Sequence, residues 1–256
     1  MKNILWIFLL LLTNWFSFAQ ESAYQAGESF KFRISYGLIN AGEATLNLTS
    51  TTYNGKNVFH AKGYGYTTGI TKKLFRVEDD YQSYFDKVTG KPYRFIRKID
   101  EGGYKKNQEG FFDQDKKTVL IKDYKNKNEN TFSITANAQD IVSSFYHLRN
   151  HPSLNSLKKG ETVQIDMFFD DEIYKFKLKF LGKEEIKTKF GKINALKFRP
   201  YVQSGRVFKE DESLTMWVSD DNNKIPLKIQ ASLLVGSLKA ELINYSGLKH
   251  NIVFKK

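Results

Sequence analysis

The sequence predicts a mainly β fold, in which strongly curved antiparallel sheets form an incomplete barrel or a sandwich with one central helix near 138–150. Apolar and polar residues alternate with a period of two along much of the chain, as is typical of strands that bury one face. Turn-forming residues recur between these runs at short intervals. One segment alone spaces its apolar residues as a helix does. Together these observations predict a single β-rich domain over residues 20–256.

The first residues have the pattern of a cleavable secretory signal. Lys2 precedes an apolar run over 4–12, and the small residues Ser17 and Ala19 form a processing site before polar residues. The run is too short to cross about 30 Å of hydrocarbon. We therefore expect a signal peptide over 1–19, no transmembrane span in the mature chain, and export to the periplasm or, alternatively, to the cell exterior.

The chain contains no cysteine. A lipoprotein would need a cysteine to acylate, and a disulfide framework would need pairs of them. Stability should therefore come from a packed core, which the many aromatic residues can fill.

The clearest strands lie over 30–36, 163–167 and 174–180. In the last of these, every second residue is aromatic or leucine, and the residues between them are lysines. Such alternation indicates antiparallel strands with one face in the core and the other in water.

Turn signals separate the strands. They are Asn54-Gly55-Lys56, Thr89-Gly90-Lys91, Glu101-Gly102-Gly103, Lys159-Gly160 and Asp220-Asp221-Asn222-Asn223. Because asparagine and glycine tolerate positive φ, each is a candidate hairpin tip. The polar tract over 122–130 is expected to be a loop or a long hairpin tip. Several further glycines lie within or beside strands, where they permit bulges and sharp bends, so the sheet should curve strongly.

A helix is predicted between Asn137, which can cap its start, and Pro152, which ends the segment. Ile141, Phe145 and Leu148 recur at helical spacing and form its apolar stripe. A helix of about three turns needs a sheet on which to bury such a stripe. We therefore expect it to dock through these three residues, with Phe145 either a buried structural residue or a residue that lines a ligand cavity.

An internal resemblance links the two sides of this helix. Residues 84–95 and 217–229 each have the pattern of strand, Asp turn, lysine, proline and strand, and a Gly-Lys turn precedes each at a similar offset. A pseudo-duplication with halves over 24–134 and 153–256 is one interpretation. Chance similarity among β-hairpins is the other.

The formal net charge of +12 favours contact with anionic partners in general. The lysines are, however, spread singly along the predicted strands, as expected for solvated faces. No clustered basic stripe or nucleic-acid module is present, so we expect no nucleic acid among the partners.

Short matching elements run through the chain in a fixed order. They are Tyr36-Gly37 with Ala41-Gly42-Glu43-Ala44, Val77 with Asp79 to Asp86, Glu101-Gly102 with Tyr104, Asp140 to Tyr146 with Leu148-Arg149, Gly182 to Thr188 with Gly191, Trp217 to Asp221 with Ile225-Pro226, and Gly236-Ser237-Leu238. By their order and number the chain resembles the exported bacterial family called domain of unknown function 3108. The resemblance implies export and a β-rich fold, and it supplies no activity. The hairpin that begins at Trp217 also resembles one hairpin of periplasmic lipoprotein carriers.

Acidic residues are the only candidates for acid–base chemistry. Asp79 and Asp80, with Asp220 and Asp221, could supply paired carboxylates for glycoside cleavage. The structural interpretation is favoured, because aspartates suit a hairpin tip and because neighbours on a strand point to opposite faces, so only one of Asp79 and Asp80 can face inward. An inward aspartate would need a partner such as Arg76 or Arg97.

Other chemistry finds no support. The four histidines show no zinc-binding spacing, and we expect no metal and no cofactor. Ser143 and Ser144 lack the glycine flanks of a nucleophile elbow.

Three classes of function remain. The leading hypothesis is a non-enzymatic periplasmic binding or carrier module for an apolar or lipid-like ligand or an envelope component, with a concave aromatic interior. A glycoside hydrolase-like enzyme and an outer-membrane barrel are the alternatives. In a filled interior the aromatics would simply be core, and the function would be an interaction surface.

Once the signal is removed, Trp217 is the only tryptophan left in the chain. Its strand places it on the face opposite Met216 and Val218. It either covers the outer side of the sheet or lines the concavity, and the carrier hypothesis expects the concave side.

Overall fold

The computed structural model describes residues 21–201, 214–233 and 236–256, so the predicted signal over 1–19 lies outside the described residues. Each half of the chain contributes a run of strands, and two helices and one 3-10 turn interrupt them. The elements are β1 (Ser29–Tyr36), β2 (Ile39–Tyr53), β3 (Lys56–Thr67), α1 (Gly69–Leu74), β4 (Glu78–Asp86), β5 (Pro92–Glu101), β6 (Tyr104–Asp113), β7 (Thr118–Asp123), β8 (Asn128–Ser133), α2 (Ile141–Arg149), η1 (Pro152–Asn155), β9 (Thr162–Phe169), β10 (Glu172–Thr188), β11 (Gly191–Tyr201), β12 (Leu214–Ser219), β13 (Pro226–Ser232) and β14 (Ser237–Ser246).

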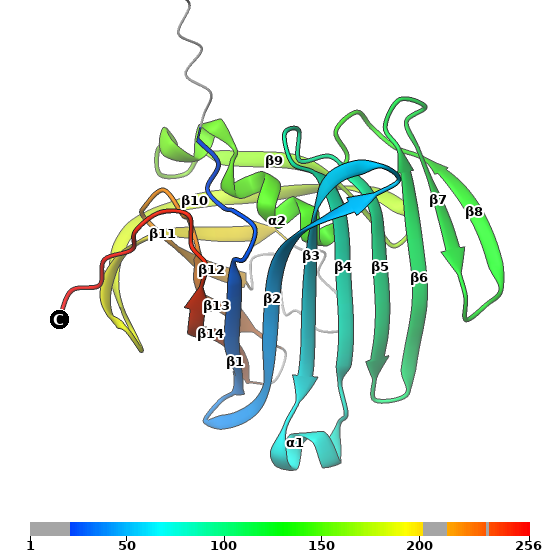
Figure 1. Ribbon diagram of the computed structural model, residues 1–256. Helices are drawn as coiled ribbons and strands as arrows, with labels where there is room; N and C mark the ends of the chain where they lie inside the picture. Colours follow the sequence, from blue (N-terminus) through cyan, green and yellow to red (C-terminus); the bar gives the residue numbers. More distant parts are fainter. Residues whose placement is uncertain (1–20, 202–213, 234–235) are drawn as a thin grey trace, which may run out of the picture.

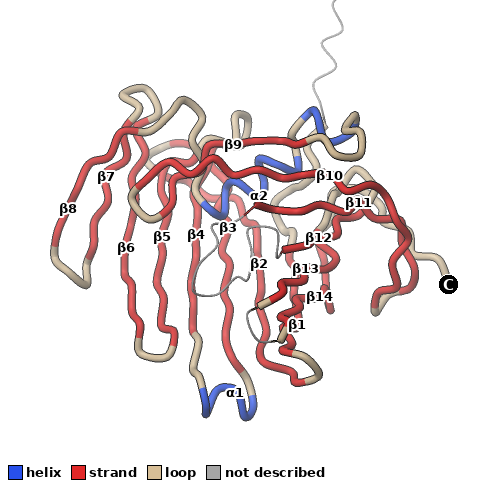
Figure 2. Tube along the Cα trace, turned by 180° about the vertical axis from the view of Figure 1, so that it is seen from behind, coloured by secondary structure: helices blue, strands red, loops and turns tan. Residues whose placement is uncertain are grey.

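All fourteen strands belong to one antiparallel sheet, in the order β8-β7-β6-β5-β4-β3-β2-β1-β14-β13-β12-β11-β10-β9. In the described chain, β8 and β9 each pair with a neighbour on one side only, so the sheet is not closed into a barrel. It curls until β9 to β11 run nearly crosswise to β3 to β6, with α2 between the two groups (Figure 1, Figure 2). The predicted mainly β, incomplete barrel is confirmed.

Strand alternation gives the sheet an inner face toward α2 and an outer face. On the inner face Met216 pairs with Ile229, which pairs with Ala240. The next residue along β12, Trp217, pairs with Lys228 on the outer face, and Lys228 pairs with Glu241. The alternation with a period of two in the sequence therefore corresponds to the inner and outer faces of the sheet.

The predicted hairpin tips lie where the strands turn, with one exception. Asn54 and Gly55 take φ values of 48° and 75°, which an Asn-Gly pair adopts readily, and join β2 to β3. The polar tract over 122–130 is a hairpin tip between β7 and β8. Gly160 instead precedes β9 and makes no hairpin, because β8 and β9 do not pair.

Helix α2 begins at Ile141, three residues later than predicted from 138. Asp140 caps it: its side chain accepts hydrogen bonds from the backbone N–H groups of Val142 and Ser143, and the Ser143 hydroxyl oxygen accepts one from the Asp140 N–H. Asn137 has a φ of 66°, a left-handed conformation that ends a turn and cannot cap a helix. Asn150 ends the helix, as predicted.

The apolar stripe predicted for α2 docks on the sheet only in part. Leu148 is buried against strands β9 to β12, as predicted. Phe145 is partly buried, and Ile141 is 41 % exposed, so the expectation that Ile141 docks is wrong. Most of the docking comes from the face one residue further on, where Val142 and Tyr146 are buried among Ala23, Leu48 and Phe85 of the N-terminal half.

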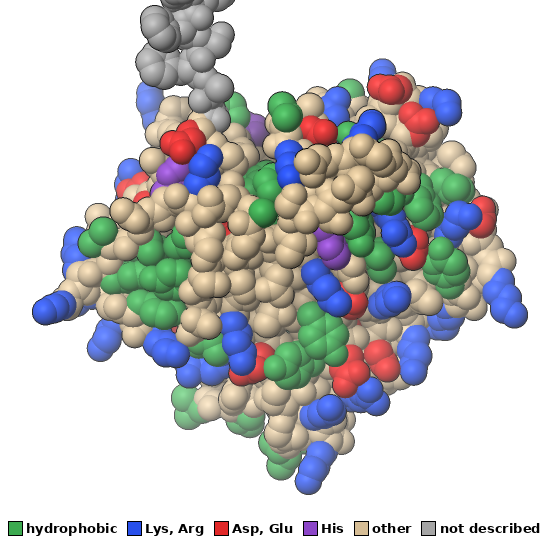
Figure 3. Space-filling model, viewed as in Figure 1, with side chains coloured by type: hydrophobic (Ala, Val, Ile, Leu, Met, Phe, Trp, Pro, Cys, Tyr) green, Lys and Arg blue, Asp and Glu red, His purple; other side chains and the backbone are tan. Residues whose placement is uncertain are grey.

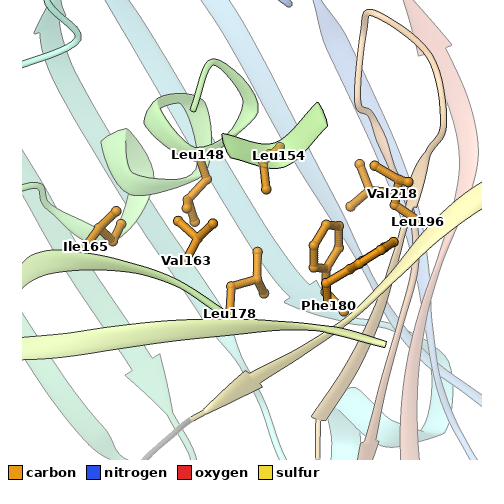
Figure 4. Packing of buried hydrophobic residues seen from close by; sticks show 9 residues of the cluster. Leu148, Leu154, Val163, Ile165, Leu178, Phe180, Leu196 and Val218 are labelled. Atoms are coloured by element: carbon orange, nitrogen blue, oxygen red, sulfur yellow. The ribbon is translucent and has the colours of Figure 1, made fainter. Parts of the chain in front are cut away.

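Two buried clusters hold the helical segments to the sheet. In one, Tyr146 packs on Phe85 with ring centroids 5.3 Å apart. In the other, Leu148 and Leu154 lie over strands β9 to β12 (Figure 4). The helical segments thus connect strands β2 to β4 in the middle of the sheet with strands β9 to β12 toward one of its ends.

Candidate functional site

A cavity with a volume of about 490 Å³ lies between α2 and strands β9 to β12. Its walls are mostly apolar. The lining residues are Ile141, Ser144, Phe145, Leu148, Met167, Phe169, Asp170, Glu172, Tyr174, Phe176, Pro200 and Met216. Ligand sites are typically concave and apolar with a few polar groups, and this cavity falls within their usual range of about 300–1,000 Å³.

One wall of the cavity is the apolar stripe of α2. Ile141, Phe145 and Leu148 lie three and four residues apart, so they share one face of the helix. Leu148 is also packed in the core, whereas Ile141 is exposed and Phe145 partly so, which leaves these two side chains available to a ligand.

The start of α2 is anchored by a buried carboxyl. Ser83 of β4 donates a hydrogen bond to Asp140 Oδ2 at 2.5 Å. Burial raises the pKa of Asp140 to about 6, against the opposing effect of the hydrogen bonds from Ser83 and from the helix N–H groups. This anchor fixes the first turn of the cavity wall.

The end of α2 is anchored by a buried ion pair. Arg149 is 3 % exposed and binds both carboxylate oxygens of Glu28, at 2.5 and 2.7 Å. Its Nε and Nη2 also donate to the carbonyl oxygen of Asn223, at 2.9 and 2.8 Å, and its guanidinium lies 5.3 Å from the ring centroid of Phe145. Arg149 therefore joins the chain before β1, the helix, and the turn between β12 and β13.

A second set of charged residues lies at the edge of the cavity, at the turn between β9 and β10. Asp170 Oδ1 accepts hydrogen bonds from Arg97 at 2.5 Å and from Lys106 at 2.7 Å. Burial opposes ionisation of Asp170, but these two cations outweigh it and lower its pKa. The Arg97 guanidinium also lies 4.4 Å from the ring centroid of Phe169, which lines the cavity. The turn is thereby held against β5 and β6.

The two aspartates of β4 face opposite ways. Asp79 shares the inner face with Tyr81, and its Oδ1 accepts a hydrogen bond from the Asp100 N–H at 3.3 Å. Burial and the neighbouring Glu101 carboxylate raise the pKa of Asp79 to about 7. Asp80 points outward and accepts bonds from Gln82 at 3.0 Å.

The predicted partners of an inward aspartate have other contacts. Arg76 is exposed and pairs with Glu78 at 2.8 Å. Arg97 donates a hydrogen bond to Asp170, although its charge lies close enough to Asp79 to offset part of the rise in the pKa of that carboxyl.

The aspartates of the β12–β13 turn stabilise the turn itself. Asp221 Oδ1 accepts hydrogen bonds from the Ser219 hydroxyl and from the N–H groups of Asn223 and Lys224, at 2.7 to 3.0 Å. Asp220 pairs with Lys183 at 2.9 Å. Neither aspartate lines the cavity, and neither do those of β4.

Trp217 lies on the outer face, not on the concave side that the carrier hypothesis expected. Its indole N–H donates to Glu184, and Lys228 and Lys197 lie 4.8 and 5.3 Å from its ring centroid. The neighbouring Met216 faces the cavity in its place. Strand alternation left both placements open, and only the register of β12 in the sheet decides between them.

Within the described residues, no three His, Cys, Asp or Glu side chains gather as metal ligands would. Both helices there are also too short to cross a bilayer. His147 and His151 lie close, with ring centroids 6.1 Å apart, at the end of α2.

An open, curled antiparallel sheet wrapped around a helix and an apolar cavity places the chain among β-barrel-like proteins. The chain belongs to the family described as protein of unknown function (DUF3108), whose model matches residues 31–243. The family resemblance drawn from the sequence is thereby confirmed. No curated protein matches the chain.

Two solved structures are similar to this one. A β-barrel-like protein of domain of unknown function DUF1849 from Brucella abortus matches with a TM-score of 0.58 at 9 % identity, over 87 % of this chain and 98 % of that one. At this identity the match supports the shared fold alone. A Bacteroides fragilis protein with a YmcC-like fold matches with a TM-score of 0.32 at 8 % identity, over 87 % and 97 % of the two chains. A TM-score this low does not establish a shared fold.

Proposed function

We propose that the protein binds an apolar or lipid-like ligand in the cavity between α2 and β9 to β12, and that it acts as a non-enzymatic binding or carrier module of the cell envelope. The observation that carries the proposal is the incomplete burial of the apolar face of α2. Leu148 packs in the core, but Ile141 and Phe145 on the same stripe are left exposed or partly exposed, and the stripe borders about 490 Å³ of space.

The location follows from the sequence. A signal peptide over 1–19 exports the chain, to the periplasm or beyond it. In an aqueous compartment an acyl chain needs a protein to shield it, and an apolar cavity supplies that shield.

Glycoside hydrolysis receives no support from a specific observation. It needs a general acid of raised pKa opposite a second carboxylate. Asp79 has the raised pKa but does not line the cavity, and Asp170 lines the cavity but has a lowered pKa.

The test uses a variant that fills the cavity. Met216→Trp should place a larger side chain in the space and weaken binding of a fluorescent acyl-chain probe by tenfold or more, on the order of 1.4 kcal/mol. Thr215→Trp is the matched control, because Thr215 is the next residue on β12 and faces the other side of the sheet. Binding should also show a negative heat-capacity change, since apolar area is buried.

Two results would reject the proposal. One is a native protein that binds no acyl-chain probe and carries no lipid detectable by mass spectrometry after purification. The other is equal weakening of binding by Met216→Trp and Thr215→Trp. Trp217 fluorescence is a poor reporter here, because its indole faces away from the cavity.

A further inference from the structure

The end of the sheet opposite α2 carries a set of exposed apolar side chains, which we call the rim patch. It comprises Leu38, Ile39, Ile70, Leu74, Phe75 and Leu238. Leu38 and Leu74 are the most exposed, at 105 % and 81 %. Figure 1 places α1 at this lower end, and Figure 3 shows green apolar side chains there beside blue Lys and Arg side chains.

The fold holds these residues together. Tyr36 of β1 pairs with Ile39 on one side and with Leu238 on the other, so the start of β2 and the start of β14 are neighbours. The Thr68 N–H donates to the Ala41 carbonyl at 3.0 Å and ties α1 to β2. Phe75 lies directly over Gly102, where even a Cβ would collide with its ring. The rim patch is therefore built from separate segments that the fold brings to the same end of the sheet.

Helix α1 contributes nothing to the core. None of its residues is buried, yet its sequence includes Ile70 and Leu74. Exposed isoleucine and leucine on a helix of six residues give up hydrophobic stabilisation that burial would supply. Large contiguous apolar surface on a folded protein usually marks a contact with a membrane or a partner.

Basic residues border the patch. Lys72 and Lys73 lie in the last turn of α1, and Arg76 follows directly after it. Glu78 pairs with Arg76 at 2.8 Å and with Lys72 at 3.5 Å, and Glu101 lies opposite Val77, so three cations face two anions here. The border keeps an excess of positive charge, which complements anionic lipid headgroups.

We propose that the rim patch docks the protein on the surface of an anionic bilayer, with the apolar side chains in the interface and the lysines at the headgroups. Fully exposed leucines on projecting turns suit insertion into a fluid interface, and apolar area plus basic charge sets the strength of such binding. The inference goes beyond ligand binding, because docking requires nothing from the cavity.

The experiment measures flotation of residues 20–256 with vesicles, since this part holds all the described structure and lacks the apolar leader. A large fraction of the protein should float with phosphatidylglycerol–phosphatidylcholine vesicles. A much smaller fraction should float with vesicles of phosphatidylcholine alone. Leu38→Ser with Leu74→Ser should weaken partition by about tenfold for each leucine. Lys72→Gln with Lys73→Gln should remove the preference for phosphatidylglycerol.

Matched controls are available at the other end of the sheet. Val88, in the turn between β4 and β5, is 93 % exposed, and Val88→Ser should leave flotation unchanged. Lys158→Gln with Lys159→Gln removes two adjacent exposed lysines from the loop before β9 and should also have no effect. All replaced side chains are exposed, so unchanged circular dichroism is expected for each variant.

Absence of flotation with phosphatidylglycerol vesicles would overturn the inference, as would equal losses in the patch variants and their controls. A stable dimer that Leu38→Ser with Leu74→Ser dissociates would assign the patch to a second copy of the chain and also overturn it. Met216→Trp separates the two proposals, because it should abolish probe binding and leave flotation intact.

Discussion

At the scale of single residues, the ion pair between Arg149 and Glu28 determines how the helix sits in the sheet. Both side chains are almost fully buried, at 3 % and 0 % exposure. Removing one partner of a buried pair leaves an uncompensated charge, which typically costs about 3–5 kcal/mol. The sequence gives no local signal for this pair, because Glu28 and Arg149 lie 121 residues apart in the chain.

A double-mutant cycle tests this pair. Arg149→Met should lower the free energy of unfolding by about 3–5 kcal/mol, and Arg149→Met with Glu28→Gln should lower it by less than the sum of the single changes. Chemical denaturation measures both. The exposed pair of Arg33 and Glu241, 3.1 Å apart, is the control, and Arg33→Met should cost about 0–1 kcal/mol. Strict additivity at the buried pair would contradict the prediction.

Asp79 should make stability depend on pH. Its pKa rises from 3.8 to about 7 in the folded chain. Between these values the folded state holds a proton that the unfolded state has lost, so this contribution to stability is full at low pH and disappears as pH rises through about 7. Asp79→Asn cannot ionise, and the variant should therefore gain stability relative to the native protein between pH 4 and pH 8.

The measurement for Asp79 is the difference in unfolding free energy between the two proteins across that pH range. Asp140, whose pKa is also raised, is present in both and cancels from the difference. A difference that stays constant with pH would show that Asp79 ionises in the folded state as it does in the unfolded one.

At the scale of elements, helix α2 divides its residues between two tasks. The face with Val142 and Tyr146 packs on the sheet, and the face with Phe145 meets the cavity. Tyr146→Ala should therefore cost about 3–5 kcal/mol, and Phe145→Ala should cost clearly less, since its side chain is packed on one side only. Urea denaturation compares them. A larger loss from Phe145→Ala would mean that the cavity is filled in solution.

The sequence predicts elements well where the signal is local. Alternation along 174–180 identifies β10, and the Asn54-Gly55 pair identifies a hairpin, because both depend on neighbouring residues alone. The start of α2 was misplaced because Asn137 and Asp140 are both good capping residues. The side of the sheet on which Trp217 lies depends on which face the helix covers, and no local pattern contains that information.

The cavity itself could be anticipated only as a concave apolar interior. Its lining comes from one helix and four strands that are brought together by the pairing of β1 with β14. The sequence indicates Phe145 as a possible cavity residue but gives no such indication for Met216 or Phe169. The residues next to these two in the sequence do not distinguish a cavity position from a core position.

At the scale of the whole molecule, the two halves follow the same plan. β1 to β6 and β9 to β14 each form six consecutive antiparallel strands. The pairing of β4 with β5 shifts register between Tyr84 and Phe85, and that of β12 with β13 shifts between Trp217 and Val218. In each case a proline follows at the start of the next strand. These parallels favour the duplication of 24–134 and 153–256, which stays a prediction.

Superposition of the two six-strand units decides the matter. A common ancestor predicts that Phe85 falls on Val218 and that Pro92 falls on Pro226. A best superposition with another strand assignment would favour chance similarity among hairpins.

The contact of Asp170 with Arg97 and Lys106 has a mechanical consequence. A closed barrel has a circumference fixed by its strand number and stagger, because every strand is hydrogen-bonded to two others. Here side-chain contacts hold the β9–β10 turn against β5 and β6, and the rings of Phe168 and Phe112 meet edge to face. The sheet is therefore curled and open at its edge strands, and it is not a closed barrel. Because no closed ladder of hydrogen bonds fixes the circumference, a change in the width of the curled sheet would break side-chain contacts and leave the pairing of neighbouring strands intact.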